Sequence, residues 1–199
     1  MSETLPTLYI ARHGETAGSL SDQHTGLADL PLIERGERNT RHLGEALRGR
    51  LFARVFASPL QRARRTCELA GFGAQAELDP DLLEWNCGEY ESLRTAEIHS
   101  ERPGWELFRD RCPGGESADD VGARADRVVG RVRRLQQDVL IFSSRDFLRV
   151  LAARWLGLEP QAGKYFLLDT ASLSALSYDH DLTQPVIKFW NDLHHLTHH

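Results

Sequence analysis

Arg12, His13, Arg62 and Glu84 are the side chains of this sequence whose chemistry could serve one reaction. A neutral imidazole is a good nucleophile near pH 7, and guanidinium groups stabilise the oxygens of an anion. A carboxyl group can donate a proton if burial raises its pKa. Taken singly, however, a histidine after a strand is usually just hydrogen-bonded, and an arginine-rich helix is usually a solvated face. What these residues mean depends on the elements that position them.

Two apolar runs end in polar residues, as strands that deliver a site would. The run over 7–11 ends at Arg12-His13-Gly14, and the run over 139–142 is followed by the turn Ser143-Ser144-Arg145-Asp146. Both runs are predicted to be buried strands. Because ligands of open α/β sheets bind beyond the carboxyl ends of strands, the two turns are expected at one edge of the sheet.

The rest of the chain alternates between helical and strand-like patterns. Leu43 and Leu47 lie at helical spacing in an amphipathic helix predicted over 32–51. Ser117 and Asp120 form a capping-box-like start for a helix that runs to about residue 136. The other predicted elements are a strand at 55–57, a helix with Ser58 as cap and Pro59 as first position that ends at Gly71, an apolar helix face over 147–155 that ends at Gly157, and strands at 172–178 and 186–190.

This alternation predicts an α/β fold, a three-layer α/β/α sandwich with a mostly parallel central sheet. With 199 residues, 41% of them hydrophobic, and no break in composition, residues 1–199 are expected to form a single domain. The pattern weakens at about 82–111, where an irregular, cap-like insertion with small helices is expected.

Composition limits the partners and the location. A formal net charge of −5 gives no general attraction for nucleic acid or an acidic membrane, so an anion site must be built locally. No apolar run approaches the ~18 residues of a membrane span, and residues 1–8 do not resemble an export signal. Three irregularly spaced cysteines predict neither a disulfide framework nor a zinc site. A cytoplasmic location is expected.

Five segments together resemble the histidine phosphatase superfamily, in its phosphoglycerate-mutase-like branch. They are Leu-Tyr-Ile-Ala-Arg-His-Gly-Glu-Thr at 8–16, Ser-Pro-Leu-Gln-Arg-Ala-Arg-Arg-Thr at 58–66, Glu84 in the run to Tyr90, Pro-Gly-Gly-Glu-Ser at 113–117 and Phe-Leu-Arg-Val at 147–150. The resemblance extends from about residue 7 to residue 191. The first two motifs are highly specific in this order and spacing.

The resemblance implies that His13 attacks phosphorus to form a phosphohistidine, which water then hydrolyses without a metal or other cofactor. It implies that Arg12 and Arg62 stabilise the equatorial oxygens, and that Glu84 is the proton donor, with a pKa raised by burial beside Trp85. Weaker candidates for substrate binding follow the first motif, where family members line the pocket: Ser19, Gln23, His24, Thr25 and Gly26.

The sequence departs from the family at the second catalytic histidine. Alignment on 147–150 places Ser144 at that histidine and Arg145 at the glycine after it. Losing a charge-assisted hydrogen bond costs about 1.5–3 kcal/mol, or roughly ten- to a hundredfold in rate. Asp146 adds a negative charge, whereas Arg145 could swing in and replace the missing positive charge while pairing with Asp146. Weak phosphatase activity is therefore expected.

Three functions remain open from the sequence. The first is a phosphomonoester hydrolase that acts on a small metabolite through His13. The second is a dehydration, isomerisation or cyclisation on the same scaffold, with His13, Glu84 and Asp146 as acids and bases and the arginines holding a substrate carboxylate. The third is an inactive relative that keeps the oxyanion pocket. In each case the partner is a small molecule that carries a phosphate or carboxylate, and the sequence does not indicate an oligomeric state.

Overall fold

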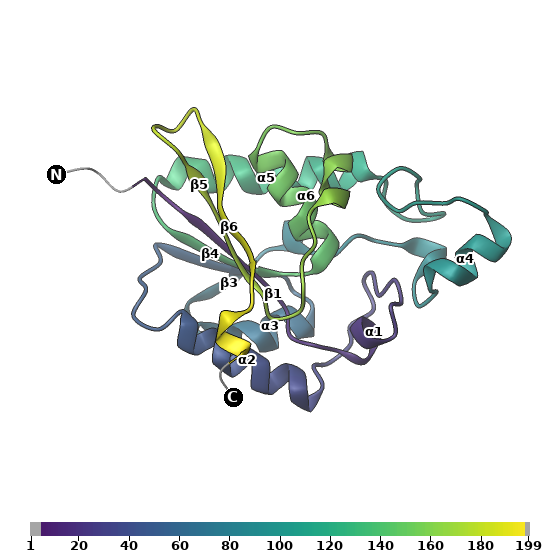
Figure 1. Ribbon diagram of the computed structural model, residues 1–199, viewed down its shortest axis with the longest axis horizontal. Coiled ribbons are helices and arrows are strands. Elements are labelled where there is room, and N and C mark those ends of the chain that lie inside the picture. The colour runs from purple at the N-terminus through teal and green to yellow at the C-terminus, as the bar shows by residue number, and fades with distance from the viewer. Residues whose placement is uncertain (1–4, 198–199) are drawn as a thin grey trace.

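The computed structural model describes residues 5–197, and its centre is one six-stranded sheet (Figure 1). The strand order is β3-β2-β4-β1-β5-β6. The strands are β1 (Leu8–Arg12), β2 (Arg54–Ala57), β3 (Ala76–Leu78), β4 (Val139–Ser143), β5 (Leu173–Tyr178) and β6 (Pro185–Asp192). The prediction that residues 1–8 carry no export signal falls partly on residues 1–4, which lie outside the described residues.

The sheet is mixed. β1, β2, β3 and β4 are parallel, whereas β5 runs antiparallel to β1 and β6 antiparallel to β5. The predicted α/β fold is confirmed, and both polar turns follow strands of its four-stranded parallel part. The two last strands can run antiparallel because a short turn joins them directly, whereas a parallel neighbour needs a crossover connection.

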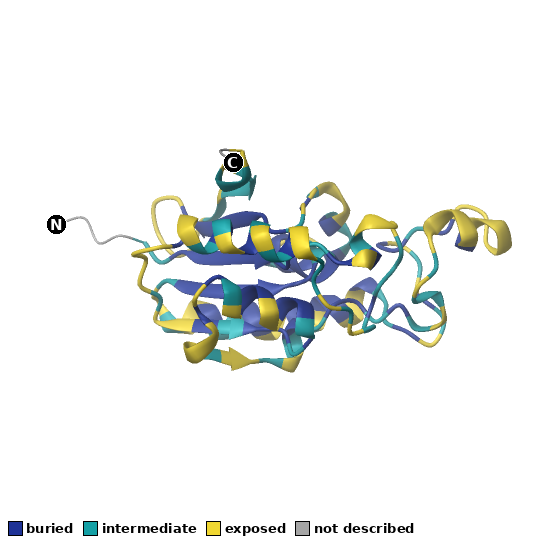
Figure 2. Cartoon of the chain, turned by 90° about the horizontal axis from the view of Figure 1, so that it is seen from below, coloured by how far each residue is buried: buried dark blue, intermediate teal, exposed yellow. Residues whose placement is uncertain are grey.

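Helices cover both faces of the sheet, so the predicted three layers are present (Figure 2). They are α1 (Ala17–Leu20), α2 (Glu34–Ala46), α3 (Gln61–Leu69), α4 (Thr95–Glu101), α5 (Ala118–Leu135) and α6 (Arg145–Trp155). Helices α5 and α6 pack on one face of the sheet, with Ile10 of β1 and Ile141 of β4. Helices α2 and α3 pack on the other face, with Ala11 and Phe142. Alternate strand residues thus point to opposite layers.

Two helix starts illustrate how local signals succeed or fail. Ser117 caps α5 in a capping box with Asp120, as predicted. The predicted start of α3 at Ser58-Pro59 is wrong, because Leu60 is extended and the helix begins at Gln61. Ser58 instead accepts a hydrogen bond from the Leu60 backbone N–H at 3.4 Å. The N–H of Gln61 donates to the Asp29 side chain at 2.6 Å, so a distant loop supplies the cap.

Helix α2 is shorter than the predicted 32–51. Leu32 pairs with Thr16 in a β-bridge, and the Ile33 N–H donates to the Glu15 carbonyl, so the chain is still extended there. At the other end, Gly49 has a φ of +80°, which a right-handed helix cannot contain. Strand β3 was not predicted from the sequence.

The segment 82–111 contains a 3-10 turn at Gly88–Tyr90 and helix α4, which lies at one end of the molecule away from the sheet (Figure 1). It pairs with the loop after β1: the His24 N–H donates to the Leu93 carbonyl, and the Ser92 N–H donates to the His24 carbonyl. Among residues 5–197, no helix combines the length and apolar character that a membrane span requires.

Candidate active site

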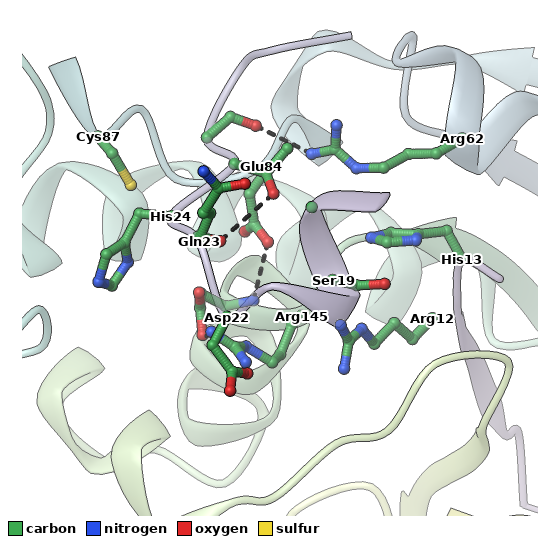
Figure 3. Close-up of a pocket in the computed structure, with 14 residues that line it drawn as sticks. Arg12, His13, Ser19, Asp22, Gln23, His24, Arg62, Glu84, Cys87 and Arg145 are labelled. Carbon is green, nitrogen blue, oxygen red and sulfur yellow. Dashed lines mark hydrogen bonds and ion pairs between the residues drawn. The ribbon is translucent and has the colours of Figure 1, made fainter. Parts of the chain in front are cut away.

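A polar pocket lies at the carboxyl ends of β1 and β4, beside the two turns noted in the sequence (Figure 3). It is lined by Arg12, His13, Gly18, Ser19, Asp22, Gln23, His24, Thr25, Gly26, Arg62, Glu84, Cys87, Arg145 and Asp146. Every site residue predicted from the sequence is in this set except Ser144. Gly18, Asp22 and Cys87 line the pocket without having been predicted.

His13 is held with one ring nitrogen available. It follows β1, and its backbone N–H donates to the Ser143 carbonyl at 3.0 Å, which fixes it beside β4. Its Nδ1 lies 2.7 Å from the Gly14 carbonyl oxygen. Because a carbonyl only accepts, we assign the proton to Nδ1, which leaves a lone pair on Nε2. Burial, followed by the charges of Arg62 and Arg12, lowers the pKa of His13 well below 6.5. The ring is therefore a neutral nucleophile at pH 7.

Arg12 lines the pocket and has one unused donor. Its Nη1 donates to the Leu168 carbonyl at 2.5 Å. Its Nε is buried and has no hydrogen-bond partner among the described residues. Burial, and then the charge of Arg145, lowers the pKa of Arg12 to about 10, so it remains a cation at pH 7. A buried guanidinium N–H without an acceptor is costly, and an anion bound beside it would supply that acceptor.

Arg62, at the second position of α3, is fixed by three hydrogen bonds. Its Nη1 and Nη2 donate to the carbonyls of Ala28 and Gly26 at 2.7 and 2.9 Å, and its Nε donates to the Ser144 hydroxyl at 3.2 Å. Each terminal nitrogen keeps one further N–H. Gly26 adopts a φ of +51°, which favours glycine and presents its carbonyl to Arg62.

Ser144 lies behind this arginine. It is the N-cap residue of α6, its side chain is fully buried, and it is absent from the pocket lining. Its hydroxyl accepts the Arg62 Nε hydrogen bond. In this position Ser144 orients a guanidinium group and does not face the pocket itself.

Glu84 caps the amino terminus of α6. Its Oε1 accepts hydrogen bonds from the backbone N–H groups of Trp85 and Phe147, both at 2.9 Å, and its Oε2 accepts one from Asp146 at 3.2 Å. Burial, and then the nearby charge of Asp146, raises the pKa of Glu84, although Arg62 and the backbone hydrogen bonds oppose the increase. The direction of this shift is the one a general acid needs.

Asp146 is neutralised by two arginines. Its Oδ1 accepts from Arg145 Nε at 3.2 Å and from Arg149 Nη1 at 2.9 Å. Burial alone would raise its pKa, but the charges of Arg145 and Arg149 outweigh burial and hold the pKa at about 2. The predicted pairing of Arg145 with Asp146 is thus present. A carboxylate held in this way is a weak base at neutral pH.

Hydrogen bonds hold the residues at the rim of the pocket in place. Ser19 forms a capping box with Thr16, and Gln23 Nε2 donates to the Ser92 carbonyl at 2.8 Å. The His24 ring lies edge-on to Trp105, and its Nε2 is 3.0 Å from the Thr95 hydroxyl. These contacts join the loop after β1 to the segment 82–111. Within residues 5–197, no three side chains of metal-binding type gather at one place.

Known proteins match the chain along most of its length. A sequence model of the histidine phosphatase superfamily (branch 1) matches residues 8–193. The sedoheptulose 1,7-bisphosphatase of Saccharomyces cerevisiae is 34% identical, over 94% of this chain and 80% of that protein. An acid phosphatase of Mycobacterium tuberculosis is 35% identical, over 89% of each protein. The solved structure of the Rv3214 product of Mycobacterium tuberculosis superposes with a TM-score of 0.88 at 32% identity, over 94% of this chain and 97% of that one.

Proposed function

The chain belongs to branch 1 of the histidine phosphatase superfamily and is an enzyme of the histidine phosphatase type; on that premise we propose that it hydrolyses phosphomonoesters of small metabolites through a phosphohistidine at His13. The observation that carries this proposal is that a neutral His13 and Arg12, whose buried Nε has no hydrogen-bond partner among the described residues, line the same pocket. A nucleophile and an unused anion donor share one pocket. A phosphoryl group satisfies both.

In the first step, Nε2 of His13 attacks phosphorus. The P–N bond forms as the bond from phosphorus to the alcohol oxygen breaks. Arg12 and Arg62 hold the equatorial oxygens, since Arg12 offers its free Nε and Arg62 its remaining terminal N–H groups. The carbonyls that already bind Arg62 keep its guanidinium in place, so little reorganisation is needed as charge develops.

Glu84 transfers the protons. It donates to the departing alcohol oxygen, and it accepts a proton from the water that then attacks phosphorus and breaks the P–N bond, releasing inorganic phosphate. Oε2 is the oxygen suited to hold that proton, because it accepts one backbone hydrogen bond whereas Oε1 accepts two. Burial favours the protonated form before the first step.

The alcohol part of the substrate would lie against the rim, formed by Ser19, Gln23, Thr25 and the Gly26 backbone. Two relatives are named as phosphatases, one of a sugar bisphosphate, which supports a small phosphorylated metabolite as substrate. A dehydration or isomerisation that uses Asp146 as a base is less favoured, because two arginines hold that carboxylate in its ionised form.

The test is detection of the phosphoenzyme. Rapid quenching with p-nitrophenyl phosphate should trap an acid-labile, base-stable phosphate on the peptide that contains His13, and His13→Ala should abolish both the adduct and turnover. His180→Ala, an exposed histidine outside the pocket, is the matched control and should keep both. Turnover that survives His13→Ala would exclude the proposal. Binding of phosphate without any turnover would identify an inactive oxyanion-binding relative.

A further inference from the structure

We propose that Arg145 makes this enzyme selective for phosphate esters that carry a second anionic group, a carboxylate or another phosphate, which its terminal amino groups bind beside the reacting phosphoryl group. This inference rests on the proposed phosphatase function. It assigns Arg145 to the body of the substrate and leaves the reacting phosphoryl group to Arg12 and Arg62.

The hydrogen bonding of Arg145 leaves its binding face open. As the first residue of α6, it lines the pocket. Its Nε donates to Asp146, while neither terminal amino group makes a hydrogen bond within the described residues. Its side chain is 39% exposed, so a ligand in the pocket can reach it. The four terminal N–H groups form a fork that matches a carboxylate or phosphate.

The position of Arg145 separates it from the reacting centre. In the pocket view its side chain lies between Arg12 and Asp22, with its guanidinium on the side of Asp22 (Figure 3). Arg62 and Arg12 both lower the pKa of His13 more than Arg145 does, as expected if its charge is further from the imidazole. A group bound there would therefore belong to the substrate beyond the scissile bond.

Asp146 and Arg149 hold the Arg145 guanidinium in position. Asp146 lies between Arg145 and Arg149, and Arg149 also donates to the carbonyls of Gly163 and Lys164. The Arg149 guanidinium further lies 4.5 Å from the centre of the Phe108 ring. Two arginines share one carboxylate, so these three side chains together keep one positive charge, although the carboxylate of Asp22 also acts on Arg145. That charge attracts an anion, and the fixed Asp146 limits the side-chain entropy lost on binding.

The other residues of the rim are less suited than Arg145 to bind a second anionic group. Gln23 is hydrogen-bonded to Ser21 and Ser92. Burial lowers the pKa of His24, so it is a neutral ring at pH 7. Asp22 is an exposed carboxylate that repels an anion unless a cation stands beside it. Among the rim residues, Arg145 is thus the cation with unused donors.

The experiment compares two substrates in matched variants. Arg145→Gln should lower kcat/KM for 3-phosphoglycerate by about 10- to 100-fold more than it lowers kcat/KM for p-nitrophenyl phosphate, because only the first ester loses a charge-assisted contact. Arg145→Lys should lose less than Arg145→Gln, because it keeps the charge without the fork. The control is Arg38→Gln, which removes an exposed arginine that pairs with Glu34 on α2, and it should change neither value.

Two outcomes overturn the assignment. Equal losses on both substrates would place Arg145 on the phosphoryl group itself, and no loss on either would make it a surface residue. If the wild-type protein turns over neither ester, the proposed function fails, and binding then decides the role of Arg145. Calorimetric titration with 3-phosphoglycerate and with inorganic phosphate should then show that Arg145→Gln weakens only the former, and equal affinity for 3-phosphoglycerate would reject the role.

Discussion

The carboxylate of Glu84 caps helix α6, with its Oε1 2.9 Å from the backbone nitrogen of Phe147. The same side chain lines the pocket and has a raised pKa. A helix amino terminus favours the ionised carboxylate, whereas burial and Asp146 favour the protonated one. These opposing influences keep the proton on Glu84 transferable, and they link the proposed acid to the strand-to-helix turn after β4.

Glu84→Gln should therefore affect substrates according to their leaving groups. Because an amide cannot supply the proton, kcat for an alkyl ester such as glycerol phosphate should fall by about 10²- to 10⁴-fold. p-Nitrophenolate leaves without protonation, so its ester should lose much less. Steady-state kinetics on both esters checks this, with Glu89→Gln, exposed on the same segment, as the control. Equal losses on both esters and in vanadate binding would make Glu84 a binding group only.

The pH dependence of kcat/KM should be bell-shaped. Activity requires a neutral His13, whose pKa is lowered by burial and by the charges of Arg62 and Arg12, and a protonated Glu84, whose pKa is raised by burial and by Asp146. Activity should rise as His13 loses its proton and fall at higher pH as Glu84 loses its own. Rate profiles from pH 4 to pH 9 with glycerol phosphate measure both limbs, and Glu84→Gln should remove the limb that falls at higher pH. A falling limb that persists in Glu84→Gln would contradict the assignment of Glu84 as the proton donor.

Much of the fold could be predicted because its strongest signals are local. β1 and β4 are buried on both faces and therefore form continuous apolar runs. The capping box of Ser117 and Asp120 is contained in four residues. β3 could not be predicted, because this three-residue edge strand is mostly exposed and has no apolar pattern. The start of α3 depends on Asp29, which lies 32 residues before Gln61.

The site residues also fall into those that the sequence could predict and those that it could not. Arg12, His13, Arg145 and Asp146 end two predicted strands, so sheet topology alone brings them to one edge. The burial of Ser144 behind Arg62 is not contained in the sequence order, because an N-cap side chain can turn either way from the strand end. Asp22 and Cys87 line the pocket through loop packing, for which the sequence carries no periodic signal.

Asp146→Asn should destabilise the fold in a pH-dependent way. At neutral pH it leaves Arg145 and Arg149 without their shared carboxylate, and we expect a loss of about 3 kcal/mol in the free energy of unfolding. The pKa of Asp146 is depressed from 3.8 to about 2, so its contribution is complete above pH 4 and is lost as the pH falls toward 2. Urea unfolding at pH 7, 4 and 2.5 measures the difference between the two proteins.

Asp126→Asn is the matched control for this measurement. It removes a half-exposed carboxylate that pairs with Arg154, and it should cost less than about 1 kcal/mol. The linkage argument is wrong if the difference between wild type and Asp146→Asn is as large at pH 2.5 as at pH 7.

The double variant Ser144→His with Arg145→Gly tests the departure from the family that the sequence leads us to expect, together with the role of Arg145. It installs the histidine and the glycine that the resemblance, aligned on residues 147–150, leads us to expect at these positions. A histidine is longer than the buried serine at 144, so its imidazolium must extend past Arg62 to reach the phosphoryl group. There it would add a charge-assisted hydrogen bond, and turnover of p-nitrophenyl phosphate should rise by at least ~10-fold. The gain should fade as the new histidine loses its proton with rising pH.

The same double variant should lose selectivity for 3-phosphoglycerate while it gains turnover of p-nitrophenyl phosphate. Without the Arg145 guanidinium, the preference for 3-phosphoglycerate over p-nitrophenyl phosphate should fall by about 10- to 100-fold, as for Arg145→Gln. Kinetics of both esters at pH 5.5 and pH 8, in the double variant and in Arg145→Gly alone, separate the two effects. If the double variant is slower than wild type on p-nitrophenyl phosphate at both pH values, Ser144 and Arg145 already form a complete phosphatase site, and the second histidine is not what limits this enzyme.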